Sequence, residues 1–350
     1  MTSQTAVAVC FSALAAAVAF QQAPRTIALR PAGATLGEPF TSIYSIRELA
    51  DGRVLISDNG NETRLVVADF RGDAVRTLGR QGSGPGEYRQ AGKLFALPHD
   101  STLLMDGDRS RRWLVLVRDS IVKTLAPDDP AVGAVPGDVF GVDSSGHVLS
   151  IRGSGADQLS REVSRLRNVA ILSSRRGAKP DTILELRGYD QHVRFNAARS
   201  FSIHTMLMGS AEEQVQLFED GWISIVRVEP YHVEWRKPDG KIIRGPDLPW
   251  EAPRSNATEK RADPDAPWAD RLAPIRRGSH GTPEGNILIA RSRWSKVTDT
   301  RYDLVDRSGK LIGNLAMPDS ERVVGFGPRS VYIVTTDGDG FQRLRRHPWP

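Results

Sequence analysis

Residues 53–88, RVLISDNGNETRLVVADFRGDAVRTLGRQGSGPGEY, are the stretch of sequence that indicates the fold. A mostly apolar run at 54–57 is followed by a polar turn and a second apolar run at 65–68. The dipeptide Arg71-Gly72 then precedes a third short run at 75–78. Tight polar turns between short apolar runs predict antiparallel strands joined by hairpins.

The order of these features resembles the NHL-type repeat of β-propeller proteins. It contains an apolar run ending in Asp58, an Asn-rich turn, Arg64, an Asp-Phe-x-Gly turn at 69–72 and the segment Gly-x-x-Gly-x-Gly-Pro-Gly-Glu-Tyr at 79–88. The resemblance implies that this stretch is one blade of a propeller of the NHL-repeat-like or TolB-like superfamily, of the exported bacterial type. The glycines at 79–88 lead into another strand and not into a helix, so we interpret them as a tight interblade connection and not as a phosphate loop.

An apolar hexad comparable to 53–58 returns five more times along the chain. The six hexads are RVLISD (53–58), STLLMD (101–106), HVLSIR (147–152), WISIVR (222–227), NILIAR (286–291) and SVYIVT (330–335). A further short strand is predicted before each hexad, including 272–277 and 323–327 for the last two. A pair of strands is predicted after each of the first five hexads. Each unit therefore has four strands, which is the pattern of a propeller blade.

These repeats predict an all-β fold, a six-bladed β-propeller with four-stranded antiparallel blades. The last blade lacks one strand, and we expect Thr26–Arg30 to supply it beside Gln342–Arg346, because closing the ring covers two exposed sheet edges. Residues 20–350 then form a single domain with insertions at about 188–214 and 249–273. The second insertion is Pro-rich and charged and forms either an idle loop or a lid.

The N-terminal residues 1–19 have the features of a secretory signal peptide. An apolar run at 6–20 is too short for a membrane span, and Ala17-Val18-Ala19 is a small-x-small cleavage site. No basic residue precedes the run, so an uncleaved anchor is the alternative. We expect a periplasmic or secreted protein without disulfides, because the single cysteine, Cys10, lies within this segment.

The composition favours a globular chain with many turns, with 39% hydrophobic residues, 32 Gly and 22 Pro. The net charge is +5, and the 47 basic residues are 39 Arg and 8 Lys that alternate with acidic residues. Because no long basic run is present, we exclude nucleic acid as a partner. The expected partner is a small ligand or a protein, no membrane contact is expected beyond the N-terminal segment, and the chain is expected to be a monomer.

The last residue of each hexad is expected to reach one end of the central channel, as the NHL resemblance implies. These residues are Asp58, Asp106, Arg152, Arg227, Arg291 and Thr335. Two acids followed by three arginines suggest a charge-segregated ring for a small anionic or zwitterionic ligand, since the guanidinium fork binds carboxylate or phosphate. In the structural alternative, each Asp closes the following turn and each Arg pairs with a nearby carboxylate.

No catalytic motif is visible in the sequence. There is no GxSxG elbow, and the seven His show no metal-ligand spacing. We therefore expect an exported binding module with no cofactor. The alternatives are a metal-dependent hydrolase that resembles the lactonase-type propellers, with Ca or Zn in the channel, and a structural scaffold.

Overall fold

The computed structural model describes residues 24–60, 62–107, 112–126, 129, 135–174, 178–195, 202–210, 212–255, 267–276, 278–292 and 299–350. Every regular element in these ranges is a β-strand. No helical segment with the length and apolar character needed to cross a bilayer occurs in the part of the chain that the structure describes. The expected signal segment 1–19, with Cys10, lies outside the described residues.

The strands of the first half of the chain form three antiparallel sheets. The first sheet has the order β3 (Ile43–Glu48), β4 (Val54–Asn59), β5 (Thr63–Asp69) and β6 (Ala74–Leu78). The second sheet has the order β9 (Ala91–Leu97), β10 (Ser101–Asp106), β11 (Arg112–Val117) and β12 (Ser120–Leu125). The third sheet has the order β13 (Asp138–Val142), β14 (His147–Gln158), β15 (Val163–Ser174), β16 (Asp181–Phe195) and β17 (Ser202–Met206).

The second half contributes three more sheets, two of which include a strand from the N-terminal segment. The fourth has the order β18 (Gln214–Leu217), β19 (Ile223–Val228), β20 (Tyr231–Arg236) and β21 (Ile242–Arg244). The fifth has the order β22 (His280–Gly281), β23 (Ile287–Ala290), β24 (Asp299–Val305), β25 (Leu311–Pro318) and β1 (Arg25–Ile27). The sixth has the order β26 (Glu321–Gly327), β27 (Ser330–Thr336), β28 (Gln342–Pro348) and β2 (Ala34–Thr35).

Two of the predicted strands are placed differently in the structure. Thr26 does not pair with the last sheet; it lies opposite Asn314 in a parallel pairing of β1 with β25. The N-terminal segment reaches the last sheet later, where Ala34 lies opposite Arg346. Of the strand predicted at 272–277, Ile275 forms only an isolated bridge, and the first strand of the fifth sheet is β22.

Each hexad lies in the second strand of its sheet, and this position explains why the hexads are almost continuously apolar. In β4, Val54 and Ile56 pack against the sixth sheet, whereas Leu55, on the other face, packs against the second sheet. A strand that is buried on both faces has apolar residues at successive positions instead of an alternating pattern. The apolar runs therefore reflect sheets that are each packed between two neighbours.

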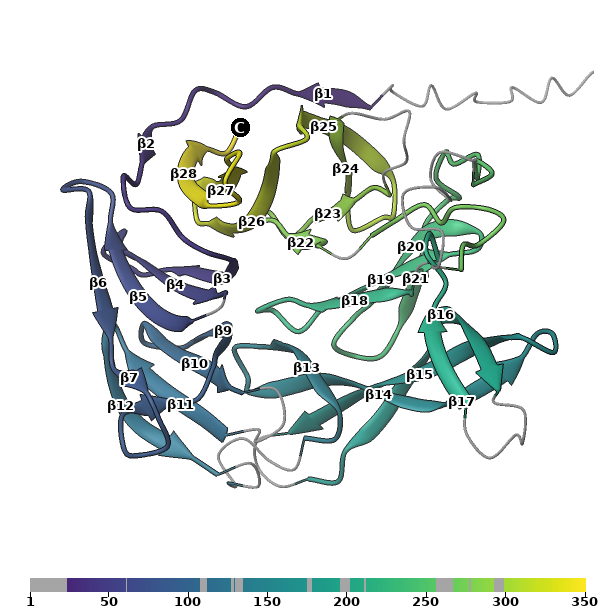
Figure 1. The fold of residues 1–350 in the computed structure, drawn as a ribbon, viewed down its shortest axis with the longest axis horizontal. Helices are drawn as coiled ribbons and strands as arrows, with labels where there is room; N and C mark the ends of the chain where they lie inside the picture. Colours follow the sequence, from purple (N-terminus) through teal and green to yellow (C-terminus); the bar gives the residue numbers. More distant parts are fainter. Residues whose placement is uncertain are drawn as a thin grey trace, which may run out of the picture.

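Figure 1 shows the sheets arranged around a common centre. Five hydrophobic clusters each join one sheet to the next along the chain. A sixth cluster joins the first sheet to the last, where Ile56 and Val66 pack with Tyr332 and Val334. The hydrophobic core is therefore divided into wedges between neighbouring sheets.

The glycine-rich segment after the first sheet forms a compact connection, as predicted. It contains the short parallel pair β7 (Arg80–Gln81) and β8 (Glu87–Tyr88). Gly79 has φ 63°, and a Cβ there would lie 2.7 Å from the Gly86 carbonyl oxygen. The positive φ and the close approach explain the glycine at position 79.

The two predicted insertions contact each other. The 188–214 region lengthens the third sheet through the end of β16 and through β17. Met208 N donates to Pro267 O at 2.8 Å, and Ala269 N donates to Met208 O at 2.9 Å, so the flanks of the 249–273 region pair with it. The middle of that region, 256–266, lies outside the described residues.

Candidate functional site

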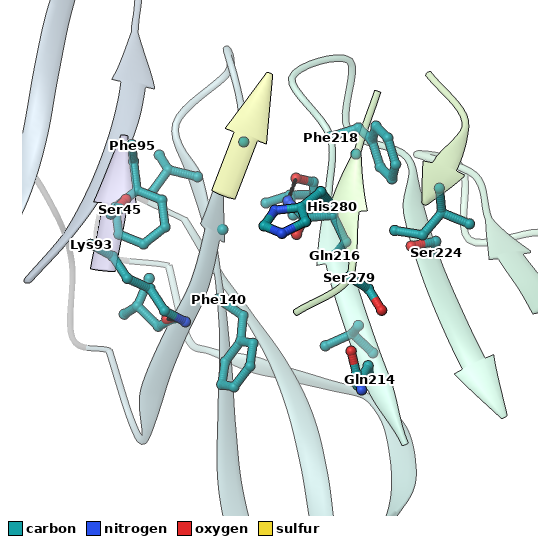
Figure 2. Close-up of a pocket in the computed structure, with 18 of the residues that line it drawn as sticks. Ser45, Lys93, Phe95, Phe140, Gln214, Gln216, Phe218, Ser224, Ser279 and His280 are labelled. Carbon is teal, nitrogen blue, oxygen red and sulfur yellow. Dashed lines mark hydrogen bonds between the residues drawn. The ribbon is translucent and has the colours of Figure 1, made fainter. Parts of the chain in front are cut away.

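The first strands of all six sheets surround one cavity of about 1710 Å³, which we call the central cavity. These strands are β3, β9, β13, β18, β22 and β26. Figure 2 shows part of its lining, where polar and aromatic side chains project from several strands. A concave site with apolar lining and a few convergent polar groups is the default candidate for ligand binding.

An aromatic and cationic wall comes from the second and third sheets. Lys93 Nζ lies 4.0 Å from the centroid of the Phe140 ring and donates to Val139 O at 3.1 Å. Phe95, two residues along β9, also lines the cavity. A cation held against an aromatic ring is attractive to a ligand that carries an anionic group and an apolar part.

Hydroxyl groups without a partner come from the fourth and fifth sheets. Within the described ranges, the Oγ atoms of Ser224 and Ser279 are buried and have no hydrogen-bond partner, and both residues line the cavity. Nearby, Gln214 Nε2 donates to Arg276 O at 2.7 Å. Buried hydroxyls usually have partners, so these two groups suggest a bound water or ligand.

His280 lines the cavity as a neutral imidazole. Its Nε2 lies 3.1 Å from Val323 O, and because a carbonyl oxygen can only accept, Nε2 must carry the proton and Nδ1 must be free of one. Burial lowers the pKa of His280 to about 4, and the nearby charge of Arg322 acts in the same direction. The ring is therefore available as a hydrogen-bond acceptor at neutral pH.

The two predicted aspartates have structural partners. Asp58 is buried and accepts hydrogen bonds from the backbone of Thr41 and Ser42, the latter at 2.7 Å. Asp106 is also buried and accepts from the backbone of Arg89 and Gln90, at 2.6 and 3.0 Å. Each carboxylate therefore fixes the segment that leads into the first strand of its own sheet.

Two of the predicted arginines are held by carboxylates. Arg227 donates to Glu213 at 2.7 Å and to Glu234 at 2.9 Å. Burial opposes its charge, but these two acids keep the pKa of Arg227 above its usual value. Arg291 forms an ion pair with the buried Asp303, and its guanidinium also lies 4.7 Å from the centroid of the Trp250 ring.

Arg152 and Thr335 complete the predicted set. Arg152 is exposed on β14, and the Thr335 hydroxyl is buried without a partner among the described residues. None of the six predicted residues lines the central cavity. Arg227, however, forms an ion pair with Glu213, and Glu213 does line the cavity. The sequence reasoning missed Lys93, which lies in a strand predicted only as an upstream strand, and it missed Ser279 and His280, which lie just beyond the strand predicted at 272–277.

The described residues contain no group of three or more His, Cys, Asp or Glu that could hold a metal ion.

Comparison with known proteins gives a fold but no family. No protein-family model matches the sequence, and no curated protein matches it. Among solved structures, a member of the DUF4221 family from Bacteroides vulgatus, a propeller-type protein, is similar over 92% of this chain and 98% of its own, with a TM-score of 0.51 and 10% identity. The chain adopts a β-propeller fold.

Two other solved structures are less similar. Streptogramin B lyase has a TM-score of 0.39 and 11% identity over 90% of this chain and 86% of its own. The calcium-binding protein regucalcin from Agrobacterium tumefaciens has a TM-score of 0.38 and 13% identity over 93% of this chain and 96% of its own.

Proposed function

We propose that this chain is an exported, six-bladed β-propeller that binds a small anionic or zwitterionic ligand in its central cavity. Six sheets of four or five strands in the described residues support the blade number. The hydrophobic cluster between the first and last sheets supports a closed ring, as does the pairing of β2 with β28.

The cavity lining carries the proposal for binding. Lys93 offers a positive charge beside the apolar Phe140 ring, while Ser224 and Ser279 offer buried hydroxyls without partners in the described part of the chain. His280 adds an acceptor. These groups are chemically suited to a zwitterionic or anionic molecule with an apolar part.

Calorimetric titration of the full chain with glutamate and succinate tests binding in the cavity. We expect Lys93→Met and Ser279→Val to weaken binding about tenfold each, since one charge-assisted or buried hydrogen bond is worth roughly 1–3 kcal/mol. Lys123→Met and Ser120→Val make the same changes at exposed positions of β12 and should leave binding unchanged. Equal affinities in all four variants would contradict a ligand site in the cavity.

A role of the six hexad-end residues in ligand binding stays a separate prediction. If they form the site, Arg227→Ala and Arg291→Ala must weaken capture of the ligand or of a protein partner in a pull-down. If both variants bind as the parent chain does, the hexad-end residues do not form the ligand site, although the fold is unaffected by this result.

The other parts of the proposal have direct tests. Metal analysis of the purified protein tests the proposed lack of a cofactor, and stoichiometric Ca or Zn would favour the hydrolase. Light scattering tests the proposed monomer.

A further inference from the structure

The first strand of the fourth sheet brings two primary amides to the central cavity. Gln214 and Gln216 are separated by one residue on β18, so their side chains leave the strand on the same face. Val215 and Leu217, on the other face, are buried against the third sheet. Both glutamines line the cavity, and none of the other five first strands contains an amide side chain.

The hydrogen bonds of the two amides leave their oxygen atoms as acceptors. Gln214 Nε2 donates to Arg276 O at 2.7 Å, and Gln216 Nε2 donates to Leu217 O at 3.1 Å. A backbone carbonyl oxygen can only accept, so in each amide the nitrogen faces the backbone and Oε1 points away from it. Neither Oε1 atom accepts a hydrogen bond from any described residue.

A carboxylate on the neighbouring strand also lacks a partner. Asp138 is the first residue of β13, is exposed and lines the cavity. Its carboxylate makes no ion pair or hydrogen bond in the part of the chain that the structure describes. Phe140, two residues further along β13, also lines the cavity.

Asp138 and Gln214 begin neighbouring strands at the same end of the cavity. Each pairs with the residue before a hexad end, on β14 and β19 respectively. Three residues further along each strand, a Cβ at Gly141 would lie 2.6 Å from Leu217 Cβ. Because the two strands run in the same direction and touch at this point, Asp138 and Gln214 lie at about the same level.

Carboxylates outnumber cations in the lining of the cavity. Seven acidic side chains line it, Asp138 and Glu212 among them, against the basic side chains of Arg47, Lys93 and Arg307. A concave site that carries an excess of one sign of charge raises the local concentration of ligand groups of the opposite sign. The end of the cavity with Asp138 and Glu212 therefore favours a cationic group.

Lys93 and the two glutamines lie on opposite sides of Phe140. The strand of Phe140, β13, contacts β9 on one side and β18 on the other. Figure 2 shows Phe140 between Lys93 and Gln214. Lys93 Nζ lies 4.0 Å from the centroid of the Phe140 ring. A molecule that lies across this ring meets a cation at one end and oxygen acceptors at the other.

We propose that Gln214, Gln216 and Asp138 form a subsite for a primary ammonium group, and that the ligand of the central cavity is an amino carboxylate. An ammonium group has three donors and no acceptor, which matches two amide oxygens and a carboxylate. A second carboxylate at this place would meet only acceptors and a like charge. This inference rests on the proposed function, since the carboxylate end of the ligand would lie at Lys93.

Titration calorimetry of the full chain with 4-aminobutyrate, 4-hydroxybutyrate and succinate tests the subsite. The three compounds have the same number of carbons and share one carboxylate, and they differ only in the group at the other end. 6-Aminohexanoate, 6-hydroxyhexanoate and adipate repeat the comparison in a longer chain. At one length or both, we expect the amino compound to bind about tenfold more tightly than its two counterparts, because charge-assisted hydrogen bonds are stronger than neutral ones.

Two variants give a readout that a merely structural role would not change. Asp138→Asn and Gln216→Met should each lower the affinity of the amino compound relative to the diacid about tenfold. The ratio is the measured quantity because a loss of folded protein changes both titrations alike. Asp181→Asn makes the same substitution at an exposed strand start outside the cavity and should leave the ratio unchanged. An unchanged ratio in both Asp138→Asn and Gln216→Met would overturn the subsite.

The outcomes also distinguish this inference from the proposed function. If the diacid or the hydroxy compound binds as tightly as the amino compound, the ammonium subsite is wrong and an anionic ligand in the cavity stands. If Asp138→Asn weakens binding of the amino compound but Lys93→Met does not, the subsite stands and the role proposed for Lys93 is wrong. If none of these compounds binds, the subsite is wrong, and the glutamate titration decides the proposed function by itself.

Discussion

Asp58 and Arg64 lie directly opposite each other on β4 and β5, and Arg64 Nε donates to the Asp58 carboxylate at 3.0 Å. The next sheet repeats the relationship, since Arg112 lies opposite Asp106 and its Nε donates at 2.7 Å. In both sheets the same carboxylate accepts two backbone N–H groups from the segment before the first strand. One buried acid thus joins three consecutive strands of its sheet.

This relationship predicts that neutralising Asp58 destabilises the fold. Asp58→Asn keeps the size of the side chain but loses the charge that pairs with Arg64, and the amide presents donors to backbone donors. Breaking a buried pair in this way costs about 3–5 kcal/mol of the free energy of unfolding. Urea denaturation measures it. Asp69→Asn, which breaks the exposed pair with Arg71, is the control and should have a much smaller effect. Equal effects would show that Asp58 does not anchor the sheet.

Much of the fold could be predicted from the sequence because the second strand of each sheet is buried on both faces. Val54, Leu55 and Ile56 are all fully buried, and such a run is visible without an alignment. The segment that joins the last sheet was placed wrongly, however. TIALR at 26–30 has the β-branched residues typical of a strand, whereas the observed β2 is the dipeptide Ala34–Thr35. The position of β2 is set by its backbone pairing with β28, and the pattern of side chains in the sequence does not indicate this pairing.

The candidate site was much less predictable, because its residues come one at a time from different sheets. Arg227 and Arg291 were found by their place at the end of a hexad, but their partners are distant in sequence. Glu213 precedes Arg227 by 14 residues, and Asp303 follows Arg291 by 12. Lys93 and His280 have no counterpart in the other repeats. Sequence repeats indicate the residues that the sheets have in common, whereas the lining of the central cavity depends on residues that differ from sheet to sheet.

We expect the free energy of unfolding to decrease as the pH is lowered from neutral, because of His280. Its folded-state pKa is about 4, below the usual value near 6.5, so the unfolded chain takes up a proton first as the pH falls. The contribution is fully present above pH ~6.5 and is lost progressively between pH ~6.5 and ~4, by up to ~3 kcal/mol. Urea denaturation at several pH values measures the slope. His280→Gln should flatten it, and His99→Gln, at an exposed turn, should not.

Export predicts a particular mature N-terminus. If residues 1–19 are a cleaved signal, the chain should begin at Phe20 and accumulate outside the cytoplasm. Fractionation followed by N-terminal sequencing checks both points. An intact Met1 on membrane-bound protein would support the uncleaved anchor, and an intact Met1 on soluble cytoplasmic protein would contradict export altogether.

Two truncations of the N-terminal segment should separate the contribution of β1 to the stability of the fold from that of β2 and the residues after it. A chain that begins at Gly33 loses β1 but keeps β2 and the residues that follow it. A chain that begins at Thr41 also loses backbone hydrogen bonds to β28 from Gly33, Leu36 and Phe40. It further loses the fully buried side chains of Leu36 and Phe40 from the cluster between the first and last sheets.

The two truncated chains are expected to lose measurably different amounts of stability. The shorter chain loses four backbone hydrogen bonds, worth ~1 kcal/mol each, and two apolar side chains worth ~1.5–3 kcal/mol each, out of a total stability of ~5–15 kcal/mol. We therefore expect the chain beginning at Gly33 to melt cooperatively at a somewhat reduced temperature, and the chain beginning at Thr41 to aggregate through the uncovered edge of β28. Leu36→Ala in the full chain isolates the packing contribution and should cost 2–5 kcal/mol. If both truncated chains melt alike, residues 33–40 do not close the ring, and the contacts between the first and last sheets hold it without them.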